Sequence, residues 1–154
     1  MQLRAVIVIV WHGQAYIPVQ AQYESGLFTS IEPVLTAGLT ADELMSAVRA
    51  ALSAGHPRLP NPTREEVRRR KDPVLKATKV RSVKELMASG TSYAISWTPN
   101  EVRLDVSSLD SKGRWINDPR KMRSFRHDAP LEDVVSLILE DARSRPELFG
   151  DAPQ

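Results

Sequence analysis

The chain has 154 residues, of which 42% are hydrophobic and 26% charged, a composition that predicts one globular domain with its own core. It contains no cysteine, which excludes disulfides and thiolate metal sites and is compatible with a reducing compartment. Its longest apolar run, residues 5–11, is too short to cross a bilayer, and its β-branched residues favour a core strand over a signal peptide.

The N-terminal third predicts three strands in a short antiparallel meander. Residues 3–11 are apolar on both faces, which is typical of a central strand. Residues 15–24 form the second strand, and Pro18 predicts that it is an edge strand or carries a bulge. Residues 27–36 form the third, with Pro33 limiting its pairing.

The next segment predicts an amphipathic helix of about four turns. Thr40 and Glu43 match the capping box, in which each side chain binds a free backbone N–H at the helix start. Apolar residues then recur at helical spacing, and Gly55 stands where a left-handed C-terminal cap belongs. We expect the apolar stripe to face the core.

Residues 56–62 contain three prolines and predict an extended loop without regular structure. Thr63 then opens a second capping box and a short polar surface helix, which we expect Asp72 and Pro73 to end. Ser82 opens a third capping box and a third helix, which we expect Gly90 to end.

Residues 91–106 give the clearest pattern in the chain. Apolar residues alternate with polar ones on both sides of a break at Pro99 and Asn100, which predicts a β-hairpin with one buried face. The apolar positions are Tyr93, Ile95, Trp97, Val102, Leu104 and Val106.

The C-terminal part predicts a short strand at residues 114–117 and a final helix. Asp128 is expected to cap this helix, Pro130 to begin it and Pro146 to end it. Five apolar residues at offsets 0, 3, 4, 7 and 8 fit an amphipathic helix, and residues 151–154 are expected to be a frayed tail. Together these elements predict one α+β domain over residues 1–150, an antiparallel sheet with about four helices.

No catalytic motif or metal-ligand spacing is present: the three histidines lie far apart in the sequence, with no second ligand nearby. One cluster leaves a metal-free hydrolase open, since a histidine beside basic residues can act as a general base at a phosphodiester. Its members are Lys121, Arg123, His127 and Asp128.

The net charge of +2 is unevenly distributed. The segment from Arg64 to Lys84 has nine Lys or Arg and three acids. The segment from Lys112 to Arg126 has six Lys or Arg and one acid. The first segment therefore leaves a nucleic-acid-binding module open as a function, although no aromatic residues interleave there for base stacking. A solvated surface helix is the simpler interpretation.

From Lys84 onward, the runs ISWTPNEVRLDVSSLD, SKGRWINDPRKMRSF and APLEDVVSLILEDARSRPEL resemble the immunity proteins of bacterial contact-dependent growth inhibition systems. The resemblance implies a small cytoplasmic protein without enzymatic activity or cofactor. It also implies one partner, the cognate toxin domain, often a nuclease, and no direct contact with nucleic acid or membrane.

For such a partner, the sequence allows two alternatives for the binding surface, one acidic and one basic. Acids of the final helix (Glu132, Asp133, Glu140, Asp141) and of the hairpin could mimic phosphates in a basic cleft, or the basic segments could face a carboxylate-rich toxin site. Trp115 is either an interface anchor or a core residue. The toxin-binding residues we predict are Glu101, Arg103, Asp105, Asp110, Lys112, Arg114, Trp115 and Asp118.

Overall fold

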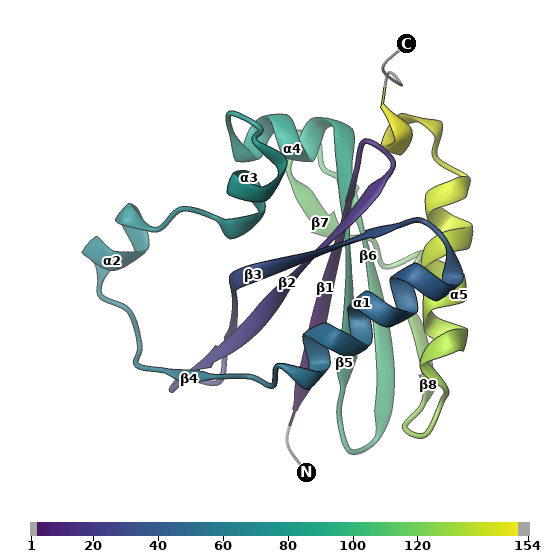
Figure 1. The fold of residues 1–154 in the computed structure, drawn as a ribbon, viewed down its shortest axis with the longest axis horizontal. Coiled ribbons are helices and arrows are strands. Elements are labelled where there is room, and N and C mark those ends of the chain that lie inside the picture. The colour runs from purple at the N-terminus through teal and green to yellow at the C-terminus, as the bar shows by residue number, and fades with distance from the viewer. Residues whose placement is uncertain (1–2, 151–154) are drawn as a thin grey trace.

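A computed structural model describes residues 3–150, which form one α+β domain around an eight-stranded sheet (Figure 1). The sheet order is β3-β2-β1-β5-β6-β7, with β4 paired to β2 and β8 to β6, and only the β2–β4 pair is parallel within this part of the chain. The predicted α+β class and antiparallel sheet are therefore confirmed. The strands are β1 (Arg4–Trp11), β2 (Gln14–Tyr23), β3 (Phe28–Gly38), β4 (Arg58–Leu59), β5 (Gly90–Trp97), β6 (Glu101–Leu109), β7 (Trp115–Asn117) and β8 (Arg123–Arg126).

The N-terminal meander has the predicted order, with β1 in the middle of the sheet between β2 and β5. β2 lies between β1 and β3, so it is not an edge strand. Its register shifts between Pro18 and Val19. At this shift Glu32 and Pro33 of β3 have no partners on β2, so the irregularity lies in β3, at the proline predicted to limit its pairing.

The predicted hairpin is β5 and β6, joined by a turn in which the backbone N–H of Thr98 donates to Glu101 O at 2.9 Å. The far edge of β6 is shared by two short strands. β8 pairs with residues 101–104 and β7 with residues 107–109. The backbone N–H of Asp118 donates to Val106 O at 2.8 Å between them, so the segment from β7 to β8 runs along the whole of β6.

Two of the predicted capping hydrogen bonds are present, at the starts of the helices that follow Thr40 and Ser82. The Thr40 hydroxyl accepts a hydrogen bond from the Glu43 backbone N–H and the Ser82 hydroxyl one from Glu85. Thr63 and Glu66 form the full reciprocal capping box at α2. The α-helices within residues 3–150 are α1 (Ala41–Ser53), α2 (Arg64–Arg69), α3 (Pro73–Thr78), α4 (Val83–Ser89) and α5 (Leu131–Arg143), and a 3-10 helix, η1, spans Pro146–Phe149.

The structure corrects two expectations at prolines. Asp72 and Pro73 do not end α2, which stops at Arg69; instead they begin α3, because the Asp72 carboxylate accepts from the Val74 N–H and proline suits the first turn. The proline-rich loop is also not free of regular structure, since it contains β4.

The start of α5 differs as well. Asp128 does not cap the helix; the N-cap is Pro130, without a side-chain hydrogen bond, and Asp128 pairs with Arg126 at 3.3 Å. Pro146 opens η1, three residues after the last residue of α5. The tail predicted at residues 151–154 lies outside the described residues.

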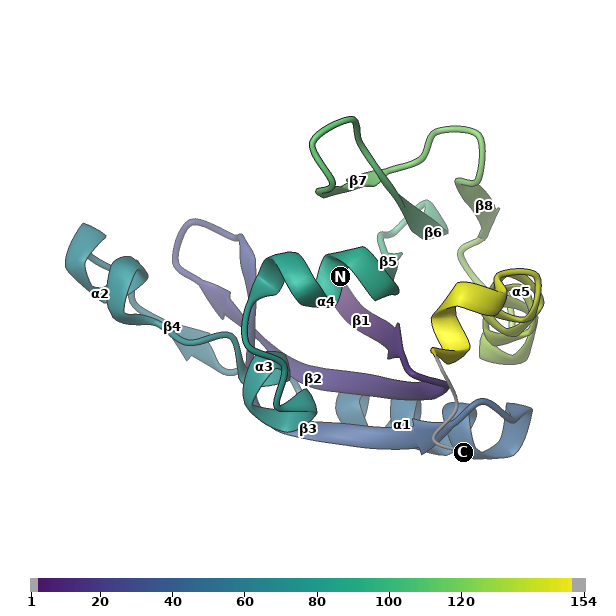
Figure 2. The same cartoon turned by 90° about the horizontal axis from the view of Figure 1, so that it is seen from above.

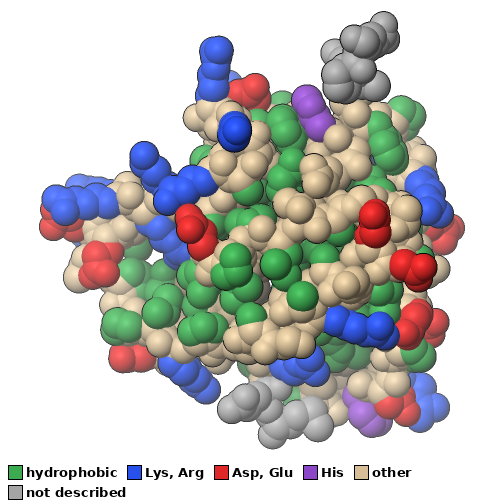
Figure 3. Space-filling view, viewed as in Figure 1, with side chains coloured by type: hydrophobic (Ala, Val, Ile, Leu, Met, Phe, Trp, Pro, Cys, Tyr) green, Lys and Arg blue, Asp and Glu red, His purple; other side chains and the backbone are tan. Residues whose placement is uncertain are grey.

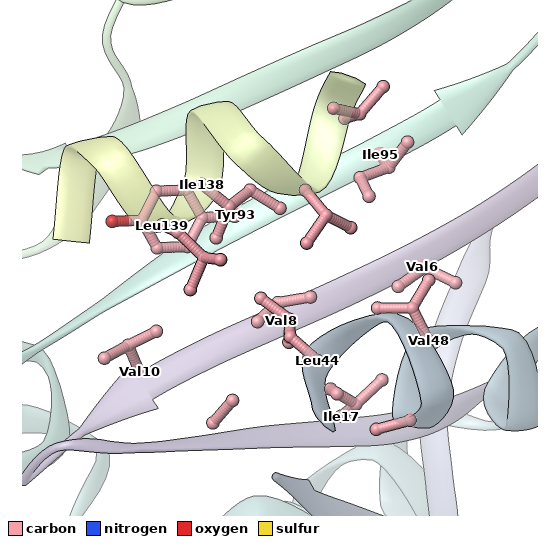
Figure 4. Close-up of a cluster of buried hydrophobic side chains, with 14 of the residues drawn as sticks. Val6, Val8, Val10, Ile17, Leu44, Val48, Tyr93, Ile95, Ile138 and Leu139 are labelled. Atoms are coloured by element: carbon pink, nitrogen blue, oxygen red, sulfur yellow. The ribbon is translucent and has the colours of Figure 1, made fainter. Parts of the chain in front are cut away.

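The core has two parts on opposite faces of the sheet, because strand side chains alternate between faces. The larger part packs α1 and α5 against one face, and Figure 4 shows side chains from both helices meeting those of β1 and β5. The smaller part packs Val74 of α3 and Leu86 of α4 against Ile9 and Tyr16. None of the helices described is long and apolar enough to cross a membrane.

Candidate partner-binding surface

The eight residues predicted to bind a partner lie on β6, β7 and the turns that follow them, at the end of the sheet where β7 and β8 share the outer side of β6. The β6–β7 register places Leu109 opposite Trp115 and Ser108 opposite Ile116. The structure therefore brings residues separated by a polar turn side by side on two adjacent strands, a region that we call the β6–β7 edge (residues 101–118).

Carboxylates and cations are arranged asymmetrically on this edge. Three aspartates form ion pairs in which the acid lies inside and the guanidinium outside. Their side chains are 11%, 19% and 5% exposed, whereas those of their arginine partners are 46%, 63% and 87% exposed. These pairs therefore expose their cations, although residues 101–118 contain four acids and three bases. The pairs are Asp105–Arg103 (3.0 Å), Asp110–Arg114 (3.4 Å) and Asp118–Arg120 (3.3 Å).

Internal hydrogen bonds account for the position of these acids. Asp110 accepts from the backbone N–H groups of Lys112 (2.8 Å) and Arg114 (2.9 Å), which closes the turn between the strands and lowers the pKa of Asp110. Hydrogen bonds from Arg120 and the Ser108 hydroxyl lower the pKa of Asp118 to about 2. Both carboxylates are therefore ionised at neutral pH and are already used by the fold.

Trp115 is half-buried and belongs to the smaller core. Its indole N–H donates to Gly90 O at 3.2 Å, and its backbone N–H lies 3.3 Å from the Met87 sulfur. Trp115 therefore joins β7 to the junction of α4 and β5, which supports the core interpretation over the free anchor.

Two apolar side chains beside Trp115 are more exposed than Trp115 itself. Leu109 and Ile116 are each 49% exposed, on opposite faces of the β6–β7 pair. Sequence reasoning did not select them, because their exposure depends on which strands the helices cover. With the exposed side chains of Lys112 and Arg114, they give the apolar and cationic mixture found in many interfaces.

Two of the four acids of α5 form ion pairs, whereas Asp133 and Glu140 are exposed and form none within residues 3–150. Asp141 pairs with Arg145 at 2.7 Å and with Lys121 at 3.1 Å, and it accepts the Tyr93 hydroxyl at 2.6 Å. Glu132 pairs with Arg49 at 2.9 Å. Burial and the hydrogen bond to Asp141 raise the pKa of Tyr93, so the phenol stays protonated. Asp141 thus attaches α5 to the sheet.

The residues considered for a hydrolase do not assemble. Lys121 is bound to Asp141 and Asp128 to Arg126, while the Arg123 guanidinium donates to nearby backbone carbonyls. Among residues 3–150, no hydrogen bond or ion pair joins any two of Lys121, Arg123, His127 and Asp128. No group of three or more potential metal-ligating side chains is found in that range either.

The basic segment from Arg64 to Lys84 is distributed over α2, α3 and α4. Figure 3 shows Lys and Arg side chains gathered over α2, with acids beside them. Arg69 pairs with Glu65 at 2.6 Å, and Arg70 turns back to donate to the Tyr23 hydroxyl at 2.7 Å and to Thr29 and Ser30. Two of the four consecutive cations are thus engaged within the protein.

The fold is that of a small α+β domain with an open antiparallel sheet. No family model matches the sequence, and no curated protein matches it. Two solved structures share the fold. A protein of unknown function from Neisseria meningitidis matches with a TM-score of 0.65 and 14% identity, over 94% of this chain and 96% of that one. One chain of the CdiA-CT/CdiI toxin and immunity complex from Yersinia pseudotuberculosis matches with a TM-score of 0.66 and 12% identity, over 93% and 98%.

Proposed function

We propose that this protein is an immunity protein that binds and neutralises the toxin domain of a contact-dependent growth inhibition system. The observation that carries the proposal is the fold shared over nearly the full length with one chain of a toxin and immunity complex. Fold alone does not fix function. The resemblance of residues 84–148 to immunity proteins is a separate line of support, drawn from sequence.

The same resemblance assigns this chain the immunity role in such a pair, rather than the toxin role. Lys121 and Asp128, two of the side chains considered for hydrolysis, are held in ion pairs with other residues, which fits a protein that acts by binding. We expect the toxin to be a nuclease and its neutralisation to take place in the cytoplasm.

We further propose that the β6–β7 edge faces the toxin with its cations. Its aspartates are consumed by internal hydrogen bonds, so the acidic phosphate mimic is the weaker of the two alternatives. An acidic patch on the toxin would meet preoriented guanidinium groups, because each arginine is held by its own aspartate. Such complementarity raises the association rate and rejects wrong partners.

Co-expression tests the function. The toxin domain is taken from the large secreted protein whose gene we expect directly upstream, and it is induced with or without this chain. Growth with both proteins and arrest with the toxin alone are expected. Arrest despite soluble production of both would refute the proposal, and arrest by this chain alone would assign it the toxin role.

A matched pair of variants tests the surface. Lys112→Glu lies on the β6–β7 edge, and Arg143→Glu makes the same charge change near the end of α5. We expect Lys112→Glu to slow association with the toxin domain at least tenfold at low salt, with the effect reduced at high salt. Arg143→Glu should leave the rate within about twofold. Equal rates for the two variants would remove the edge from the interface.

A further inference from the structure

A second feature of the surface lies at the opposite end of the sheet from the β6–β7 edge. Residues 58–72, which we call the α2 arm, leave the sheet at β4, form α2 and return at α3. Both views place α2 apart from the body of the domain (Figures 1 and 2). None of the six side chains of α2, all within the described chain, is buried.

The arm is attached at a few points. β4 pairs with the end of β2, the Ser25 backbone N–H donates to the Asn61 side chain at 2.9 Å, and Arg70 donates to Tyr23, Thr29 and Ser30. A helix of six residues is marginal by itself. The capping box at Thr63 and these attachments therefore hold α2 in place without burying it in a core.

Two hollows adjoin the arm. One, of about 530 Å³, is lined mainly by apolar side chains. The other, of about 350 Å³, shares Val67 and Arg70 with the first in its lining. Val67 is the only apolar residue of α2 and is 58% exposed. The apolar side chains of the first hollow are those of Tyr23, Ile31, Leu59, Pro60, Pro62 and Val67.

On the arm around the first hollow, the acids of α2 are engaged in contacts within the protein, whereas several cations are not. Glu65 is paired with Arg69, and Glu66 accepts the Thr63 backbone N–H, so both acids of α2 are used. Within residues 3–150, no hydrogen bond or ion pair engages the side chains of Arg64, Arg68 and Lys71. The charged side chains that line the hollow itself are those of Glu66, Arg69 and Arg70. Residues 58–72 contain six Lys or Arg and three acids, so the α2 arm as a whole is cationic beside an apolar floor.

We propose that the α2 arm is a second docking element for the protein partner, and that its larger hollow receives an apolar side chain flanked by carboxylates. The inference rests on the proposed function for the partner's identity. An apolar hollow excludes water around the cations, which strengthens their pairing with acids. Nucleic acid fits less well, because phosphate contacts need no apolar floor and Tyr23 is the only aromatic side chain lining this described hollow.

The arm contains a convenient reporter, since trypsin cleaves after its exposed basic residues. Free protein and its complex with the toxin domain are digested under identical conditions, and cleavage within residues 64–71 is followed by mass spectrometry. We expect the complex to protect these sites at least tenfold. Unchanged cleavage in a formed complex would overturn the inference, and protection by a tRNA at physiological salt, without the toxin, would assign the arm to nucleic acid.

Three variants extend the test. Val67→Ser removes the exposed apolar group, Arg68→Glu reverses a free charge, and Arg81→Glu makes the same reversal in the basic segment outside the arm. We expect the first two to weaken toxin binding at least tenfold and Arg81→Glu to stay within twofold. Thermal midpoints should agree for all three, because the substituted side chains are exposed.

The outcomes separate the two proposals. If wild-type protein binds the toxin domain and the arm variants bind equally well, the docking role of the arm is wrong while the immunity function stands. If wild-type protein fails to bind, both fall. Loss of binding in Arg81→Glu as large as in Arg68→Glu would show a general charge effect, which also overturns the assignment to the arm.

Discussion

Replacing Asp141 by asparagine tests how α5 is held to the sheet. The carboxylate is 18% exposed and binds Arg145, itself 14% exposed, Lys121 and the Tyr93 hydroxyl. Asparagine has nearly the same shape and keeps one acceptor oxygen. It removes the negative charge and leaves the guanidinium of Arg145 at the edge of the core with neutral acceptors, among them Thr91 and Ser107.

The expected cost follows from the burial of the partners. Removing one member of a buried ion pair costs about 3–5 kcal/mol, because the remaining charge loses its compensation. Lys121 is 37% exposed and regains water, so its share is about 0–1 kcal/mol. Asparagine retains part of the hydrogen bonding, so we expect Asp141→Asn to lower the free energy of unfolding by about 3 kcal/mol. For a chain of 154 residues this corresponds to a fall in Tm of about 6–12 °C.

Urea denaturation at neutral pH measures this difference, with the midpoint and slope fitted separately. Asp133→Asn, which removes an exposed acid from the first turn of the same helix, is the control and should cost less than about 1 kcal/mol. Tyr93→Phe completes a double-mutant cycle, in which the two losses should not be additive. A loss below about 1 kcal/mol for Asp141→Asn would show that the network does not stabilise the docking of α5.

Three further predictions concern single residues. Gly90→Ala should destabilise the protein by about 1–3 kcal/mol in urea, because a Cβ there would lie 2.8 Å from Val10 O and 2.9 Å from Leu86 O, both backbone atoms. The pKa of Asp118 is lowered in the folded state, so its stabilising effect is present above about pH 4 and is lost as the pH falls toward 2; Asp118→Asn should remove this part of the acid limb of a stability–pH profile. Trp115→Ala should cost about 3 kcal/mol of unfolding free energy and Trp115→Phe clearly less; a stable Trp115→Ala protein with weakened toxin binding would restore the anchor interpretation.

The strands were predictable because their signal is local. In β5 and β6 each apolar residue alternates with a polar one, and the same alternation decides which face is buried. The helix α3 was not predicted, because the pair Asp72 and Pro73 is compatible both with the end of the preceding helix and with the start of a new one. Only the hydrogen bond from Val74 to the Asp72 side chain distinguishes them.

The candidate surface was predictable in composition and not in orientation. Sequence placed Arg103 and Asp105 on one face of a strand, but which of the two would be exposed depends on packing against neighbouring strands. The exposure of Leu109 and Ile116 likewise depends on how far the helices extend over the two faces of the sheet, since these side chains lie on opposite faces. The spacing of Thr63 and Glu66 did identify α2, but nothing local indicated that it would stand clear of the sheet.

The pairing of β1 with β5 has a consequence for how the protein is made. This ladder joins residues 4–11 to residues 90–97, and it is the seam between the N-terminal meander and the C-terminal strands. Loop closure over such a distance is slow compared with forming a hairpin. While the chain is synthesised, one edge of β1, with the sequence AVIVIVW, stays unpaired until β5 has been made. An uncharged, β-branched edge of this kind is prone to pair with other chains, so the newly made protein passes through a stage that favours aggregation before the seam closes.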